Sequence, residues 1–224
     1  MDVERVRIRV EILKRESDGR AKFELFQRLN SGGAELSPQE SRNCVATMLN
    51  PNFFGQLIQM SEYPPFRHTT TLTTRAIEEQ KHVELVLRYL AYRYKPYQNG
   101  IDVHDWLDEV LIDMSQDNSF DLVAAKDRFE ETFKLLEGLL GTDTFKRYEG
   151  AFNGGFSIAA FEAISHGVSM HLESLVATPD KQLLVERIKA MWSEHQFVDS
   201  TKAGTRGSTR LSKLLPFAKE WFNT

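Results

Sequence analysis

Cysteine is nearly absent from this chain of 224 residues, in which Cys44 is the only one. A single thiol excludes a disulfide within the chain and suits a reducing compartment, so we expect a cytoplasmic protein. Cys44 lies in a predicted helix and has no histidine near it in sequence. This setting favours a buried thiol over a reactive nucleophile.

Long apolar runs are missing as well. No stretch approaches the roughly 18 consecutive apolar residues that a membrane span requires. The N-terminus also lacks the apolar segment that is typical of a signal peptide. We therefore expect no membrane partner.

Neither sign of charge dominates the chain. The sequence has 28 basic and 32 acidic residues, which leaves a net charge of -4. This balance excludes a surface that is basic everywhere, as wholesale coating of nucleic acid would need. It leaves room for a local basic patch.

What the chain does have is helical periodicity. Apolar residues recur at intervals of three and four in most segments after Pro51, and Asp102 and Ser157 are typical helix N-caps. The threonine-rich run 69–74 favours a helix N-cap region over a phosphate-binding cluster. We predict long helices over about residues 74–94, 121–140 and 157–175, with the last one interrupted at Gly167.

One segment alternates instead. Val6–Leu13 places its apolar residues at every second position, which predicts a half-buried strand. No second strand is predicted, so the partner of this strand would have to come from another copy or another polypeptide. The predicted fold is mainly α, an irregular multi-helix bundle with one N-terminal β-strand. Residues 1–50 would form the strand and a helical hairpin, and residues 51–224 one continuous helical bundle.

The segment 23–43 reads as a short helix, a Gly-Gly turn and the start of a second helix. Gly32 and Gly33 can end the first helix, because glycine adopts left-handed backbone conformations without a side-chain penalty. Ser37 and Glu40 form a complete capping box around Pro38. By local chemistry alone, this segment is a well-formed helical hairpin with no catalytic task.

The same segment resembles the conserved block of domain-of-unknown-function family 262, typified by the GmrSD modification-dependent restriction enzymes. The resemblance covers roughly the first 50 residues, and a ParB-like nucleotide-binding core precedes the block in the family. The signature of that core, Asp-Gly-Gln-Gln-Arg, is absent from this chain. We expect a structural role for the motif residues, in which Arg28 and Asn30 bond to backbone carbonyls. The matching positions are Phe26, Arg28, Asn30, Ser37, Glu40, Arg42 and Asn43.

A basic loop near the C-terminus is the strongest candidate for a binding site. Two glycines and several hydroxyl residues precede the last predicted helix, which is the composition of an anion cradle. The order of residues is not that of a Walker loop, and a flexible solvated linker is the alternative. We predict that nucleic-acid phosphate meets Lys202, Arg206, Arg210 and Lys213.

A metal site is not predicted. The acidic residues Asp105, Asp108, Glu109 and Asp113 favour a solvated helix face. His166 and His171 are five positions apart, so they do not form the pair with a spacing of four that a helical zinc site uses. We identify no catalytic residue, and no arrangement typical of a metal-dependent nuclease.

These observations predict a helical DNA-handling or assembly module of a GmrSD-like phage-defence restriction system. The resembled family cleaves modified DNA in a nucleotide-dependent reaction, but this chain would not be an enzyme on its own. It would hold no cofactor, since a nucleotide and a divalent metal would act with the missing upstream core. The alternative is a non-enzymatic interaction module, or a truncated relic, that binds a partner through Val6–Leu13.

Overall fold

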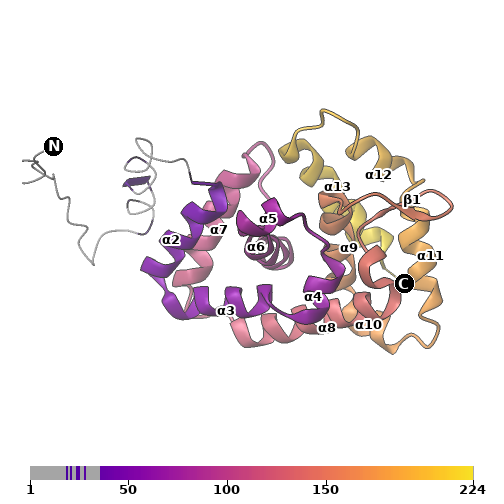
Figure 1. Ribbon diagram of the computed structural model, residues 1–224, viewed down its shortest axis with the longest axis horizontal. Helices are drawn as coiled ribbons and strands as arrows, with labels where there is room; N and C mark the ends of the chain where they lie inside the picture. The colour runs from indigo at the N-terminus through magenta and orange to yellow at the C-terminus, as the bar shows by residue number, and fades with distance from the viewer. Residues whose placement is uncertain (1–18, 20, 22–23, 26–27, 29–35, 224) are drawn as a thin grey trace, which may run out of the picture.

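The computed structural model describes residues 36–223 together with residues 19, 21, 24, 25 and 28. The predicted strand Val6–Leu13 and the Gly-Gly turn lie outside them. The described part is mainly helical, which confirms the predicted fold class (Figure 1). Its helices are α2 (Pro38–Leu49), α3 (Pro51–Ser61), α4 (Pro64–Thr69), α5 (Thr74–Glu78), α6 (Lys81–Tyr94), α7 (Val103–Gln116), α8 (Leu122–Leu140), α9 (Ile158–Met170), α10 (Leu172–Ala177), α11 (Gln182–Met191), α12 (His195–Ser200) and α13 (Gly207–Trp221).

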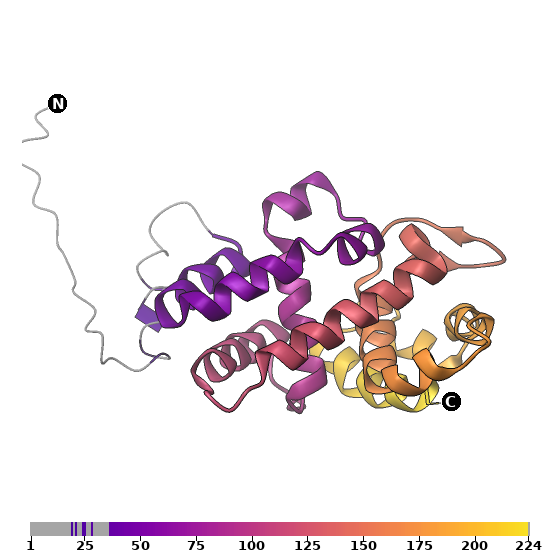
Figure 2. The same ribbon diagram turned by 90° about the horizontal axis from the view of Figure 1, so that it is seen from below.

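Helix α6 is the centre of the fold. All of its residues from His82 to Tyr92 are buried, and it packs against α3, α7 and α9. In Figure 1 it is seen nearly end-on with the other helices around it. Figure 2 views the molecule from below and shows the long helix α8 running across it. A helix buried on every side has no solvated face, so its charged residues must find partners inside the protein.

The predicted single helix over residues 74–94 is wrong, because the chain forms two helices there. Gln80 separates α5 from α6 and has a positive φ of 59°. This left-handed conformation is unusual for a residue other than glycine, asparagine or aspartate, so no turn signal marked the position. Thr73 caps α5, which confirms the N-cap prediction for the threonine-rich run.

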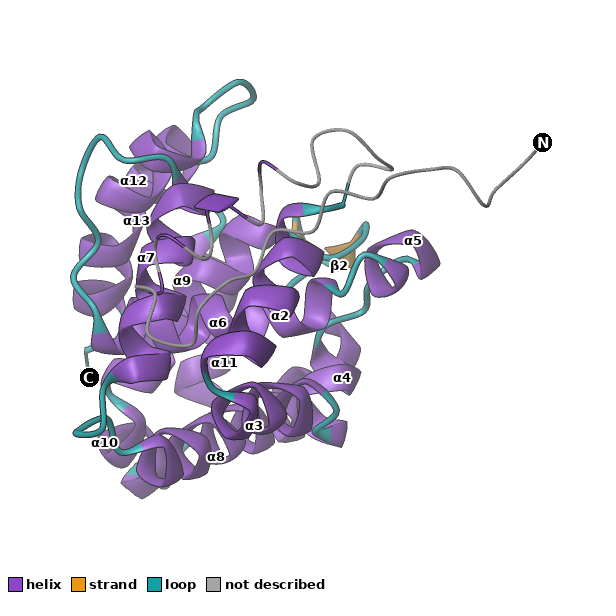
Figure 3. Cartoon of the chain, turned by 90° about the vertical axis from the view of Figure 1, so that its left-hand side faces the viewer, coloured by secondary structure: helices purple, strands orange, loops and turns teal. Residues whose placement is uncertain are grey.

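A small hairpin adds the β-structure that the sequence did not predict. Strands β1 (Arg147–Tyr148) and β2 (Phe152–Asn153) pair in antiparallel fashion, and Figure 3 shows one of them as a short orange segment among the helices. Two residues are too few to show an alternating pattern, which needs about four to eight. The hairpin presents Arg147 to the surface, where its side chain is 66% exposed.

Helices α9 and α13 lie against each other at Gly167. A side-chain carbon on this glycine would lie 2.2 Å from Phe222 Cδ2 and 2.7 Å from the carbonyl oxygen of Ala218. Helix α9 continues through Gly167 to Met170, so the predicted interruption at this residue is wrong. The glycine permits the close approach of α13 rather than breaking the helix.

Cys44 is exposed, so the prediction of a buried thiol is wrong. It lies on α2, whose buried face is formed by Gln39, Arg42, Val45 and Ala46 instead. Helix α2 packs against α3 and α7. The boundary predicted at residue 50 therefore falls between two helices in contact.

The capping box of α2 is confirmed. Ser37 Oγ accepts from Glu40 N at 3.3 Å, and Glu40 Oε2 accepts from Ser37 N at 2.7 Å. We expect the Ser37→Ala variant to lose about 1 kcal/mol of unfolding free energy, the usual effect of removing an N-cap. Urea denaturation of the two proteins measures the difference. Thr47→Ala on the same helix is the matched control, and an equal loss there would contradict the capping role.

Candidate functional site

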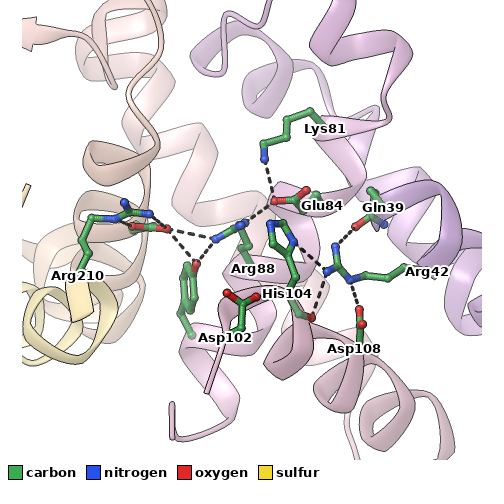
Figure 4. Close-up of polar contacts among 11 residues, drawn as sticks. Gln39, Arg42, Lys81, Glu84, Arg88, Asp102, His104, Asp108 and Arg210 are labelled. Carbon is green, nitrogen blue, oxygen red and sulfur yellow. Dashed lines mark hydrogen bonds and ion pairs between the residues drawn. The ribbon is translucent and has the colours of Figure 1, made fainter. Parts of the chain in front are cut away.

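A chain of buried charged residues joins three helices. Arg88 on α6 donates to Glu84 Oε1 at 2.7 Å and to Glu162 Oε1 on α9 at 3.2 Å. Arg210 on α13 donates from Nε and Nη2 to the two carboxylate oxygens of Glu162, at 2.7 and 3.1 Å. The hydroxyl of Tyr92 accepts from Arg88 and lies 3.3 Å from Glu162 Oε1 (Figure 4). We call these five residues the Glu162 network.

Glu84 and Arg88 keep their charges at neutral pH. Burial raises the pKa of Glu84, but Arg88 and Lys81 outweigh burial and lower it to about 2. Burial lowers the pKa of Arg88, yet Tyr92 and the two carboxylates raise it above its ordinary value. Burial raises the pKa of the Tyr92 hydroxyl, which stays protonated and can donate to Glu162. Buried ions of this kind are stable only because each finds an opposite charge and good hydrogen-bond geometry.

A second charged cluster anchors α2 to α7. Arg42 is fully buried, and its Nε lies 2.5 Å from Asp108 Oδ1. Its Nη2 donates to the carbonyl of His104 at 3.1 Å, and its Nη1 donates to Gln39 (Figure 4). The pKa of His104 is lowered, mainly by burial and next by the positive charge of Arg42. Asp108 is therefore not part of a solvated acidic face, and the prediction was wrong for this residue because its partner lies 66 positions away.

A basic pocket adjoins the Glu162 network. It has a volume of about 420 Å³ and lies where the start of α9, the end of α12 and the segment before α13 meet. Three cations and three hydroxyl side chains line it, and none of its described lining residues is acidic. Trp192 and Phe197 form an apolar wall. The lining is completed by Arg147, Ser157, Ile158, Ala159, Val198, Thr201, Lys202, Thr205 and Arg210.

The structure separates the four basic residues that the sequence grouped together. Lys202 and Arg210 line the basic pocket, whereas Arg206 is exposed just before α13 and Lys213 lines a different groove with α12. Residues 202–213 contain no acidic residue, but the fold brings acidic partners to two of these four cations. Arg210 pairs with Glu162, and Lys202 Nζ lies 2.7 Å from Asp199 Oδ1.

Several residues of this region were not singled out from the sequence. Arg147 belongs to the unpredicted hairpin, and Glu162 lies on α9, where every residue from Ala159 to Ser169 is buried. Glu84 and Arg88 are four positions apart, a spacing that predicts an ion pair on a helix. The same spacing is common on exposed helix faces, so it does not indicate burial.

Four of the motif residues of the family resemblance have local or packing roles. Ser37 and Glu40 cap α2, Arg42 anchors it, and Asn43 accepts from the side chain of Gln39 at 2.8 Å. Arg28 is exposed. Phe26 and Asn30 lie outside the described residues.

Neither a metal centre nor a membrane-spanning helix is found in the described part of the chain. No group of three or more histidine, cysteine or carboxylate residues there could hold a metal ion. No helix there is long and apolar enough to cross a bilayer. His166 lies within α9 and His171 is the residue that ends it. The Nε2 of His171 lies 2.7 Å from the carbonyl oxygen of Lys219.

Comparison with known proteins finds no matching family model, no similar curated protein and no similar solved structure.

Proposed function

We propose that this chain is the DNA-handling module of a GmrSD-like restriction system of phage defence, and that it holds a nucleic-acid phosphate in the basic pocket. The observation that carries this proposal is the meeting of Arg147, Lys202 and Arg210 at a pocket that no described acidic residue lines. The resemblance of residues 23–43 to family 262 is the reason for proposing a GmrSD-like system. The basic pocket supplies a place where DNA can be bound.

The start of α9 suits a phosphate in this pocket. Ser157, Ile158 and Ala159 line it, and they form the first turn of a helix of 13 residues. The backbone N–H groups of a first turn and the helix dipole both favour an anion. Ser157 N donates to the carbonyl of Phe145 at 3.0 Å, and Ala160 N donates to Ser157 Oγ at 3.3 Å. The N–H groups of Ile158 and Ala159 are therefore the ones of this turn that a ligand can use.

The cations can turn to a phosphate at little cost. Lys202 pairs with Asp199 and Arg147 with Glu149, but in each pair both side chains are substantially exposed. Exposed pairs contribute only about 0–1 kcal/mol, so a phosphate can replace them. Arg210 uses Nε and Nη2 for Glu162 and keeps Nη1 for a ligand. Its position is fixed by the buried carboxylate.

Trp192 is half-buried and offers a surface for a base or a sugar, and Phe197, which is buried, supports it. Trp192 and Phe197 are in edge-to-face contact with ring centroids 5.1 Å apart. The indole Nε1 of Trp192 is buried and has no hydrogen-bond partner among the described residues. Aromatic surfaces beside a basic groove are the common way in which proteins hold unpaired nucleotides.

The salt dependence of DNA binding tests the proposal. Each phosphate contact contributes about 0.9 to the slope of log affinity against log salt concentration on duplex DNA. We expect the Arg147→Ala/Lys202→Ala double variant to flatten this slope by about 0.9, because the pocket loses one phosphate. Arg206→Ala should flatten it further if the DNA continues along the start of α13. Fluorescence anisotropy over a salt series measures the slope.

The matched control is the double variant Arg75→Ala/Lys134→Ala, which removes one exposed arginine and one exposed lysine that do not line the pocket. It should leave the slope unchanged, and circular dichroism should show equal helix content in all variants. Equal slopes in the pocket variant and the wild type would contradict phosphate binding here. Undetectable DNA binding at low salt would instead favour the interaction-module alternative.

A further inference from the structure

The basic pocket has an apolar side that phosphate contacts do not use. Trp192 lines it and is half-buried, and Val198, which is 41% exposed, lines it as well. Ile158 adds a third apolar residue, half-buried at the start of α9. Phosphate and sugar oxygens are bound by cations, hydroxyl groups and backbone N–H groups, which need no apolar surface. The apolar side of the pocket therefore calls for a second part of the ligand.

The indole of Trp192 is supported from the protein interior. Its ring lies edge-to-face with that of Phe197 at a centroid distance of 5.1 Å, and Phe197 in turn lies 6.4 Å from the ring of Phe217. Both phenylalanines are buried. The indole Nε1 is buried too, so the side-chain surface that Trp192 gives to the pocket is carbon. A ring supported in this way loses little entropy when a flat group stacks on it.

The same pocket has a cationic side, on which Arg210 is the fixed charge. Its side chain is 18% exposed, and the buried carboxylate of Glu162 accepts from its Nε at 2.7 Å. The start of α9 adds the N–H groups of Ile158 and Ala159, which suit a phosphate. The pocket volume of about 420 Å³ falls in the range of small-molecule sites, about 300–1,000 Å³. One phosphate and one base fit such a volume, whereas a duplex does not.

We infer that the basic pocket takes one unpaired nucleotide of a DNA strand, with its base stacked on Trp192 and its phosphate at Arg210 and the start of α9. The inference rests on the proposed DNA binding and adds the form of DNA that is bound. In a duplex the neighbouring pairs cover both faces of each base, so a base can stack on a side chain only after it leaves the helix. A single strand has no such cost. Single-stranded DNA is therefore the preferred ligand, and a base extruded from a weakened duplex is the second source of the same nucleotide.

The lining also predicts that no particular base is selected. Asparagine, glutamine and carboxylate side chains read base edges, and none of them is among the described residues that line the pocket. The hydroxyl of Thr201 already donates to the carbonyl of Phe197 at 2.9 Å. Arg210 could read guanine, but it uses Nε and Nη2 on Glu162. Homopolymers of different bases should therefore differ in affinity only through the strength of stacking.

Competition between forms of DNA tests this inference. A labelled oligothymidylate is bound at low salt and displaced by unlabelled DNA of equal length, either single-stranded, fully paired, or paired with one central mismatch. We expect the single strand to compete at least about tenfold better than the fully paired duplex, because the duplex must first release a base. The mismatched duplex separates the two sources. It lies between the others where an extruded base enters, and it equals the paired duplex where only a free strand does.

The Trp192→Ala variant should bind oligothymidylate about five- to a hundredfold more weakly, the effect of losing one stacked base. Trp192→Phe, which keeps an aromatic ring, should recover most of the affinity. Phe54→Ala is the matched control, because Phe54 is a half-buried aromatic residue of α3 that does not line the pocket. Oligothymidylate should also quench the indole fluorescence of the wild type far more than that of Trp192→Phe. This measurement stays decisive if Trp192→Ala fails to fold.

A fully paired duplex that competes as well as the single strand would overturn this inference. DNA binding itself would stand if the Arg147→Ala/Lys202→Ala variant still flattened the salt slope. Wild-type affinity for oligothymidylate in Trp192→Ala would overturn the inference as well. Undetectable binding of every form of DNA at low salt would contradict the inference and the proposed function together.

Discussion

The Glu162→Ala variant is expected to lose about 3–5 kcal/mol of unfolding free energy, the range found when one partner of a buried ion pair is removed. Glu162 is fully buried and accepts from both Arg88 and Arg210. Without this carboxylate, Arg88 keeps Glu84 as its one described acidic partner, and Arg210 keeps none. The cost comes mainly from the cations that remain buried rather than from the lost contacts themselves.

Chemical denaturation of the variant measures this loss, with Glu79→Ala as the matched control. Glu79 also accepts from an arginine, Arg75, but that pair is exposed. Its removal should change the unfolding free energy by less than about 0.5 kcal/mol. Glu162→Gln should fall between the two, because it keeps the shape and loses the charge. A loss below about 1 kcal/mol in Glu162→Ala would mean that water replaces the carboxylate, and the network would then not be a structural core.

The Gly167→Ala variant is expected to lose about 3 kcal/mol or more, at the upper end of the range for overpacking a core. The added methyl group would lie 2.2 Å from Phe222 Cδ2 and 2.7 Å from the backbone oxygen of Ala218. The ring of Phe222 is fully buried, and a backbone oxygen cannot rotate away. Helices α9 and α13 would therefore have to separate, and this would also disturb the contact of Arg210 with Glu162.

Gly138→Ala on α8 provides the opposite expectation from the same substitution. A methyl group there meets nothing within 4 Å, so the better helix propensity of alanine should stabilise the protein by about 0.5–1 kcal/mol. Thermal and urea denaturation of both variants measure the contrast. If Gly167→Ala were as stable as the wild type, the close approach of α9 and α13 would not exist in solution.

The helix starts show what local chemistry predicts well. Ser37, Asp102, Asp121 and Ser157 each accept from a backbone N–H two or three residues ahead, as their positions in the sequence indicate. A cap and its partner are neighbours in the chain, so the signal and the contact occupy the same short segment. The break at Gln80 apart, which is local, the predictions that went wrong concern how distant segments pack. Asp108 was expected to be solvated, but Arg42 of α2 lies against it.

The candidate sites were predictable only in part. The sequence identified Lys202 and Arg210 as members of a basic loop, and both line the basic pocket. It did not place Arg147 there, because this residue arrives on a hairpin of two-residue strands.

The sequence by itself determined that the chain is mainly helical and where most of its helices begin. Periodicity and capping act over a few residues, so one segment contains all the information they need. Only the tertiary structure decided which charges are buried. Glu162 meets Arg88 across 74 positions and Arg210 across 48, and no spacing rule reaches that far. The pairing of Arg210 with Glu162 and the burial of His166 follow from how α6, α9 and α13 pack, because burial is a property of the assembled helices.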